Sequence, residues 1–109
     1  MSPALAISEQ TVKHLRYLEA GEDDLDSKLR RLLENEYRRR LTRYRLTDRL
    51  LTSKYGMSFQ DFEAKEMVKA RGYSWEVEAD AQEWEMAVDG VRTMERLLGE
   101  LIGAASHAG

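Results

Sequence analysis

The feature that most restricts the fold of this chain is a stretch, residues 27–54, that contains neither glycine nor proline. At a rise of about 1.5 Å per residue, the stretch predicts one helix of roughly 40 Å, well above the average helix length. A helix this long needs packing partners along its whole length. Shorter helical segments flank it, so we expect an all-α fold, a helical bundle built around one long helix.

Apolar residues fall on two sides of this helix. A wide stripe predicts the face that packs within the subunit, and its members are Leu29, Leu33, Tyr37, Leu41, Tyr44 and Leu51. Leu32, Leu46 and Leu50 form a narrower stripe on another side, shared with Arg39. Because one face is left over after packing within the subunit, we predict a homodimer whose interface contains Leu32, Leu46 and Leu50.

Shorter elements precede and follow the long helix. Residues 8–20 predict a first helix, capped by Ser8 and ended by Gly21, and residues 22–26 form an acidic linker. Ser58 and Asp61 form a capping box that opens a helix through Gly72. Residues 73–78 alternate large and polar side chains as a short strand does, and we interpret them as an ordered linker. A last helix is expected from about residue 80 to 102.

These boundaries divide the chain into three parts. Residues 1–26 hold the short helix and the acidic linker, residues 27–103 form the helical domain, and residues 104–109 are a flexible tail. Trp84 falls on the apolar stripe of the last helix, which predicts a core position. Residues 1–7 contain no basic side chain and their apolar stretch stops at Ser8, so we expect neither a secretion signal nor a membrane span, and a cytoplasmic protein.

Charge is strongly segregated along the chain. Residues 1–26 carry two basic and six acidic side chains, residues 27–54 carry ten and three, and residues 55–109 carry five and eleven. A basic ridge follows the long helix and consists of Arg31, Arg38, Arg45 and Arg49. Together with the neighbouring Arg39, these arginines are the candidate contacts for a charged partner. One interpretation is pairing with the chain's own carboxylates or with a protein partner, which the net charge of −3 favours. The alternative is contact of the same arginines with RNA or DNA phosphates.

Residues that could carry chemistry are few. The absence of cysteine excludes disulfides, iron–sulfur clusters, Cys-based zinc sites and cysteine nucleophiles. The two histidines, His14 and His107, have no glutamate three residues before them, which argues against a carboxylate-bridged metal pair. Glu63 and Lys65 match half of a metal-dependent nuclease motif, but residues two apart on a predicted helix point apart. We therefore predict a protein that is not an enzyme and has no metal or cofactor.

The segment between the last two predicted helices holds the candidate partner-binding residues, Tyr73, Trp75, Glu76 and Glu78. Tyrosine and tryptophan are frequent anchors of protein interfaces, and irregular segments between rigid helices often carry recognition residues. A structural interpretation, in which Trp75 covers a helix end, stays open beside it.

Three blocks of the sequence, Leu33–Arg49, Lys54–Phe62 and Gly72–Glu85, resemble a family of small, mostly helical prokaryotic proteins. Members of that family are often encoded beside small toxin-like proteins and look like the antitoxin components of toxin–antitoxin modules. The resemblance implies a non-enzymatic protein that binds and masks a small toxin, and the left-over face of the long helix adds the homodimer to this hypothesis. The alternative class is a small RNA- or DNA-binding helical protein that uses its arginine-rich helix.

Overall fold

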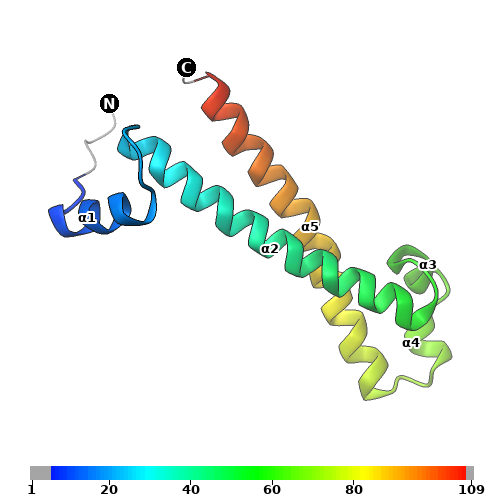
Figure 1. Ribbon diagram of the computed structural model, residues 1–109. Helices are drawn as coiled ribbons and strands as arrows, with labels where there is room; N and C mark the ends of the chain where they lie inside the picture. Colours follow the sequence, from blue (N-terminus) through cyan, green and yellow to red (C-terminus); the bar gives the residue numbers. More distant parts are fainter. Residues whose placement is uncertain (1–5, 108–109) are drawn as a thin grey trace. The chain divides into compact units, whose positions relative to one another are not determined.

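The computed structural model describes residues 6–107, and every regular element in this range is a helix (Figure 1). The chain forms two compact units, Met1–Glu36 and Tyr37–Gly109. The boundary lies inside α2 (Leu25–Tyr55), so the start of the long helix groups with the N-terminal segment and the rest with the following helices. The predicted all-α class is confirmed, but the structure has two long helices, α2 with 31 residues and α5 (Trp75–His107) with 33, where one was predicted. The predicted boundary after residue 26 differs from the observed division.

The first unit contains α1 (Glu9–Leu18) and the first turns of α2. Ser8 caps α1 as predicted, because its hydroxyl accepts a hydrogen bond from the Thr11 amide at 3.2 Å. Leu15 is the buried apolar residue of α1, with 4% of its surface exposed. Leu29 and Leu33 were expected on the core stripe but are 37% and 50% exposed. Within this unit, only α1 and residues 19–24 are available to pack against α2.

A buried lysine organises the connection between α1 and α2. Lys28 is only 2% exposed, and its ammonium donates hydrogen bonds to the carbonyls of Glu19 and Gly21 at 2.5 and 2.9 Å. Asp23 supplies the compensating carboxylate at 3.4 Å. A buried charge is tolerated only when it is paired and hydrogen-bonded, so residues 19–24 are held around the ammonium rather than forming a loose linker.

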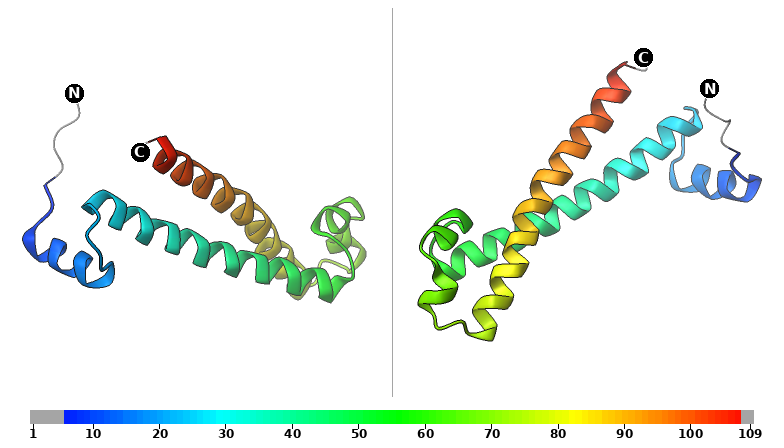
Figure 2. Two further views of the ribbon diagram at one scale, coloured as in Figure 1. Left: turned by 45° about the horizontal axis from the view of Figure 1, so that its top comes forward. Right: turned by 180° about the vertical axis from the view of Figure 1, so that it is seen from behind.

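The second unit contains the rest of α2, then α3 (Phe59–Ala64), α4 (Met67–Ala70) and α5 (Trp75–His107). Figures 1 and 2 agree that residues 37–55 of α2 cross the middle of α5, with α3 and α4 beside the end of α2. Gly56, in the left-handed conformation with φ of 65°, ends α2 and turns the chain toward α3.

An aromatic cluster fills the core where α2, α3 and α5 meet. Trp84 is completely buried, as predicted, and its ring lies 5.9, 5.4 and 5.1 Å from the rings of Tyr55, Phe59 and Phe62. Its indole N–H donates a 2.8 Å hydrogen bond to the Asp48 carboxylate, so the ring is buried with its polar atom satisfied.

A second cluster lies further along the two long helices. Leu41 of α2 packs with Met94 and Leu98 of α5, and Tyr44 is among the partly buried residues around them. Gly90 allows this approach, because a Cβ atom at this position would lie 2.5 Å from a ring carbon of Tyr44. Close helix approach is therefore found at Gly90, while nothing lies within 4 Å of a Cβ built at Gly99.

The helix predicted from Ser58 to Gly72 is interrupted. Ser58 caps α3 as expected, its hydroxyl accepting from the Asp61 amide at 3.1 Å, but α3 ends at Ala64. Glu66 has φ of 48° and separates α3 from α4. A left-handed residue cannot continue a right-handed helix, so the single predicted helix becomes two short ones.

The prediction that residues 73–78 form a strand-like linker was wrong. α5 begins at Trp75, because the Ser74 hydroxyl accepts from the Val77 amide at 3.3 Å and Glu76 and Glu78 place negative charge in the first turn. The apparent alternation arises from the helix itself, with Trp75 facing outward and Val77 facing the core. At the other end α5 continues to His107, so residues 104–107 are helical rather than a tail, and residues 108–109 lie outside the described range.

Candidate interaction surfaces

Two exposed aromatic residues, Tyr73 between α4 and α5 and Trp75 at the start of α5, form what we call the aromatic pair. Trp75 is 88% exposed and Tyr73 59% exposed. Tyr73 has φ of 55° and its amide donates to the Val68 carbonyl at 2.8 Å, so the backbone holds the tyrosine in place although its side chain is largely in solvent. Trp75 stands on the first turn of a long helix, not on an irregular segment as predicted.

The two acidic residues predicted beside this pair have other roles. Glu76 accepts a 2.7 Å hydrogen bond from Lys54, and Glu78 is half-buried. Lys54 also binds Asp80 at 2.7 Å, and Asp80 accepts from the Tyr55 hydroxyl at 2.6 Å. This network joins the end of α2 to the first turns of α5 and thereby fixes the position from which Trp75 projects.

In this network, burial and hydrogen bonding shift the pKa of Asp80 in opposite directions. Burial alone would raise the pKa of the Asp80 carboxyl, but hydrogen bonds from Lys54 and Tyr55 outweigh it and lower this pKa below 3.8. The hydrogen bonds to Asp80 and Glu76 raise the pKa of Lys54. Burial, with the hydrogen bond to Asp80, raises the pKa of Tyr55. Lys54 and Asp80 are therefore a charged pair at neutral pH.

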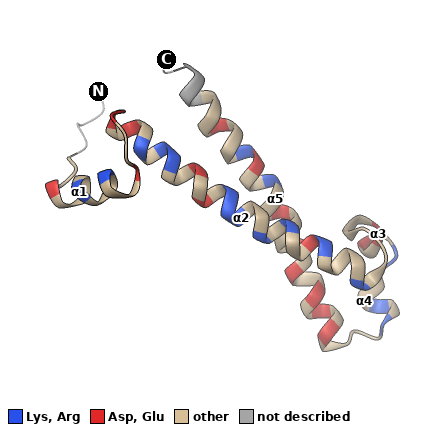
Figure 3. Ribbon diagram, viewed as in Figure 1, with Lys and Arg blue, Asp and Glu red and all other residues tan. Residues whose placement is uncertain are grey.

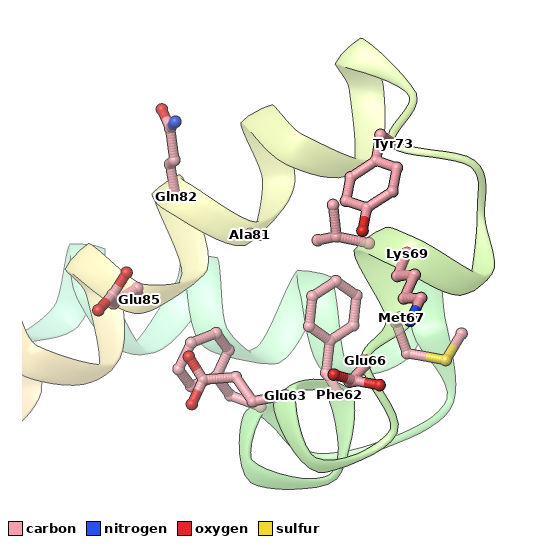
Figure 4. A pocket seen from close by; sticks show the side chains of 11 residues that line it. Phe62, Glu63, Glu66, Met67, Lys69, Tyr73, Ala81, Gln82 and Glu85 are labelled. Carbon is pink, nitrogen blue, oxygen red and sulfur yellow. The ribbon is translucent and has the colours of Figure 1, made fainter.

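A pocket of about 420 Å³ opens between α3, α4 and α5 (Figure 4). Its apolar lining comes from Phe59, Phe62, Met67, Val68 and Ala81. Three glutamates, Glu63, Glu66 and Glu85, stand among its lining residues, together with the single cation Lys69. Tyr73 also lines it, so the pocket and the aromatic pair share one edge. The pocket has the size of a ligand site and an acidic character.

Both non-glycine residues with positive φ in the described range line this pocket, Glu66 at 48° and Tyr73 at 55°. Left-handed conformations cost energy for residues with a Cβ atom, and such residues concentrate at functional sites. Sequence reasoning missed the pocket because it predicted a continuous helix across Glu66. The Ser74 cap, with Glu76 and Glu78 after it, was the available signal that a helix starts at Trp75.

The predicted basic ridge is divided between the two units. In the first, Arg31 donates to Glu19 at 2.5 Å and also binds Asp23, whose pKa it lowers to about 2. In the second, Arg45 pairs with Glu95 of α5 at 2.9 Å. Arg38 and Arg39 also interact with other groups of the protein. Pairing with the chain's own carboxylates, one of the two interpretations of the ridge, is thus observed for Arg31 and Arg45.

Arg43 and Arg49 differ from these arginines. Both are exposed, and neither has an ion pair among residues 6–103, whose side chains the structure describes. Figure 3 shows the contrast between α2, where blue positions dominate, and the first half of α5, where red positions do. Of the predicted dimer residues, Leu46 and Leu50 are 49% and 60% exposed, while Leu32 is half-buried in the first unit.

The described range also bears on metal binding and on membrane spanning. Among these residues no group of three or more His, Asp or Glu side chains could hold a metal ion, and His14 is exposed on α1. No described helix combines the length and apolar character needed to cross a bilayer. Comparisons with protein-family models, with curated proteins and with solved structures found no match.

Proposed function

We propose that the protein is a non-enzymatic binding protein that holds and masks a small protein partner, as the antitoxins that its sequence resembles do. The observation that carries this proposal is Trp75, a tryptophan 88% exposed on the first turn of a long helix. An exposed tryptophan side chain adds no buried area to the isolated fold. For a partner it offers a large contact area, and few side-chain torsions lose freedom on binding. Tyr73, two residues earlier in the chain, is a second exposed aromatic residue, with 59% exposure.

Rigidity supports the same proposal. The hydrogen bonds of Lys54 to Glu76 and Asp80 tie the start of α5 to the end of α2, so Trp75 is presented from a fixed base. A preorganised anchor loses little entropy when a partner binds. The partner we expect is the product of the gene next to the one that encodes this chain.

The test is co-expression of the chain with that neighbouring gene product, followed by calorimetry on the purified pair. Trp75→Ala is expected to weaken binding about 30-fold or more, which corresponds to roughly 2 kcal/mol. Tyr17→Ala is the matched control, because Tyr17 is an aromatic residue of α1, in the first unit, with 84% exposure. Unchanged affinity in Trp75→Ala, with an unchanged helical signal, would contradict the proposal.

A second candidate function is RNA or DNA binding, which the exposed Arg43 and Arg49 favour. Phosphate contacts release counterions, so such binding weakens steeply as salt concentration rises. Tight binding of a nucleic acid at physiological salt, lost when Arg43 and Arg49 are changed to glutamine, would establish this alternative instead.

A further inference from the structure

One face of α2 in the second unit is apolar and turned away from the core. Leu46 and Leu50 are one helical turn apart, and Arg43 lies on the same side. The two leucines are 49% and 60% exposed, whereas Leu41 and Leu51 on the opposite side are 7% exposed. We call Arg43, Leu46, Arg49 and Leu50 the outer face of α2.

This outer face is poorly suited to pair with itself. Residues 37–55 hold six arginines and Lys54 but a single carboxylate, Asp48, which accepts the indole hydrogen bond of Trp84. Two outer faces brought together would oppose arginine to arginine without a carboxylate between them, and like charges in contact are destabilising. The surface that covers Leu46 and Leu50 must therefore be acidic as well as apolar.

The same chain carries such a surface. The pocket between α3, α4 and α5 offers apolar side chains from Phe59, Phe62 and Met67, with Glu63 and Glu85 at its edge (Figure 4). No lysine or arginine occurs between Gly72 and Val91, so α5 contributes the carboxylate of Glu85 to the pocket lining and no cation. Charge and hydrophobicity are complementary between the outer face of α2 and this pocket.

We propose that the outer face of α2 docks into the pocket of a second copy of this chain, with Leu46 and Leu50 entering it and Arg43 and Arg49 pairing with Glu63 and Glu85. An amphipathic helix in an apolar groove is a recurring mode of recognition. The leucines are those of the predicted homodimer, but they meet an acidic pocket instead of their own counterparts. The interface joins two different surfaces, so two copies either close it reciprocally or add further copies.

Sedimentation velocity at low ionic strength tests the proposal without any partner protein, so its outcome is independent of the proposed function. The wild-type chain is expected to sediment above the 12.6 kDa of one copy at high micromolar concentration. The double variants Glu63→Lys/Glu85→Lys and Arg43→Glu/Arg49→Glu are each expected to be monomeric. Their equimolar mixture is expected to associate, because each face of one variant again meets the opposite charge on the other.

The control for the pocket variant is Glu22→Lys/Glu83→Lys, which changes the net charge equally at two exposed glutamates outside the pocket lining. It is expected to associate as the wild type does. If a lysine variant loses its helical signal, Glu63→Gln/Glu85→Gln removes the charges more gently and is expected to associate at least tenfold more weakly. A monomeric wild-type chain overturns the proposal, and so does a folded pocket variant that associates as strongly as the wild type.

Discussion

We expect that replacing Gly90 of α5 with any larger residue destabilises the protein. A Cβ atom at this position would lie 2.5, 2.6 and 2.7 Å from three ring carbons of Tyr44, whereas carbon atoms in contact normally keep about 3.5–4.0 Å apart. Tyr44 packs at the cluster formed by Leu41, Met94 and Leu98, so its ring cannot move without disturbing that cluster. Gly99, on the same helix, is the natural control because a Cβ there meets nothing within 4 Å.

The magnitude follows from two opposing terms. Alanine in a helix interior is favoured over glycine by about 1 kcal/mol, and this gain applies to both positions. Overpacking against Tyr44 costs about 1–3 kcal/mol and applies only to Gly90→Ala. We therefore expect Gly99→Ala to stabilise the protein by up to about 1 kcal/mol, and Gly90→Ala to destabilise it by as much as about 2 kcal/mol.

Urea denaturation followed by far-UV circular dichroism measures both free energies of unfolding. A double-mutant cycle identifies the cause, because in a Tyr44→Ala background the ring is gone and Gly90→Ala should become stabilising. Two results would refute the reasoning: equal stabilisation by Gly90→Ala and Gly99→Ala in the wild-type background, or an unchanged cost of Gly90→Ala after removal of the tyrosine ring.

Two further predictions concern the core and the acid side of the pH range. Trp84→Ala is expected to lower the free energy of unfolding by about 3–5 kcal/mol, measured by denaturation, because it empties a fully buried site; a loss below about 1 kcal/mol would contradict that core position. Arg31 holds the pKa of Asp23 at about 2, against an ordinary value of 3.8, so the stabilisation this carboxylate supplies is complete above pH 3.8 and is lost as pH falls toward 2. Methyl resonances of the buried Leu15 should follow this loss, and Arg31→Gln should reduce it; identical acid titrations of the two proteins would argue against the pairing.

The long helix and the main core residue could be predicted because each depends on a strong local pattern. Residues 27–54 lack any helix breaker, and the observed α2 spans Leu25–Tyr55. Trp84 lies on a continuous apolar stripe, and it is buried. The same reasoning wrongly predicted core positions for Leu29 and Leu33, because an apolar stripe shows which face of a helix is apolar but not whether another element covers that face.

The departures from prediction have physical causes that one-dimensional patterns do not contain. Lys28 is buried because the backbone carbonyls of residues 19 and 21 converge on its ammonium. Every residue has a backbone carbonyl, so the sequence does not reveal which carbonyls will meet in three dimensions. The start of α5 was misplaced because Trp75 and Val77, two residues apart, fit a strand and the first turn of a helix equally well. The Ser74 hydroxyl decides between them.

The pocket depends on the feature that sequence reasoning missed. A continuous helix from Phe59 to Ala70 would leave no bend between Phe62 and Met67, and the bend at Glu66 is what places both on one pocket. Its left-handed backbone costs roughly 1–2 kcal/mol, so other contacts must impose it. Those contacts are backbone hydrogen bonds: Glu66 donates to Glu63 at 3.0 Å, Ala70 to Glu66 at 2.9 Å, and Tyr73 to Val68 at 2.8 Å. Because main-chain groups set the bend, side-chain changes at the edge of the pocket are expected to alter its charge while its shape is retained.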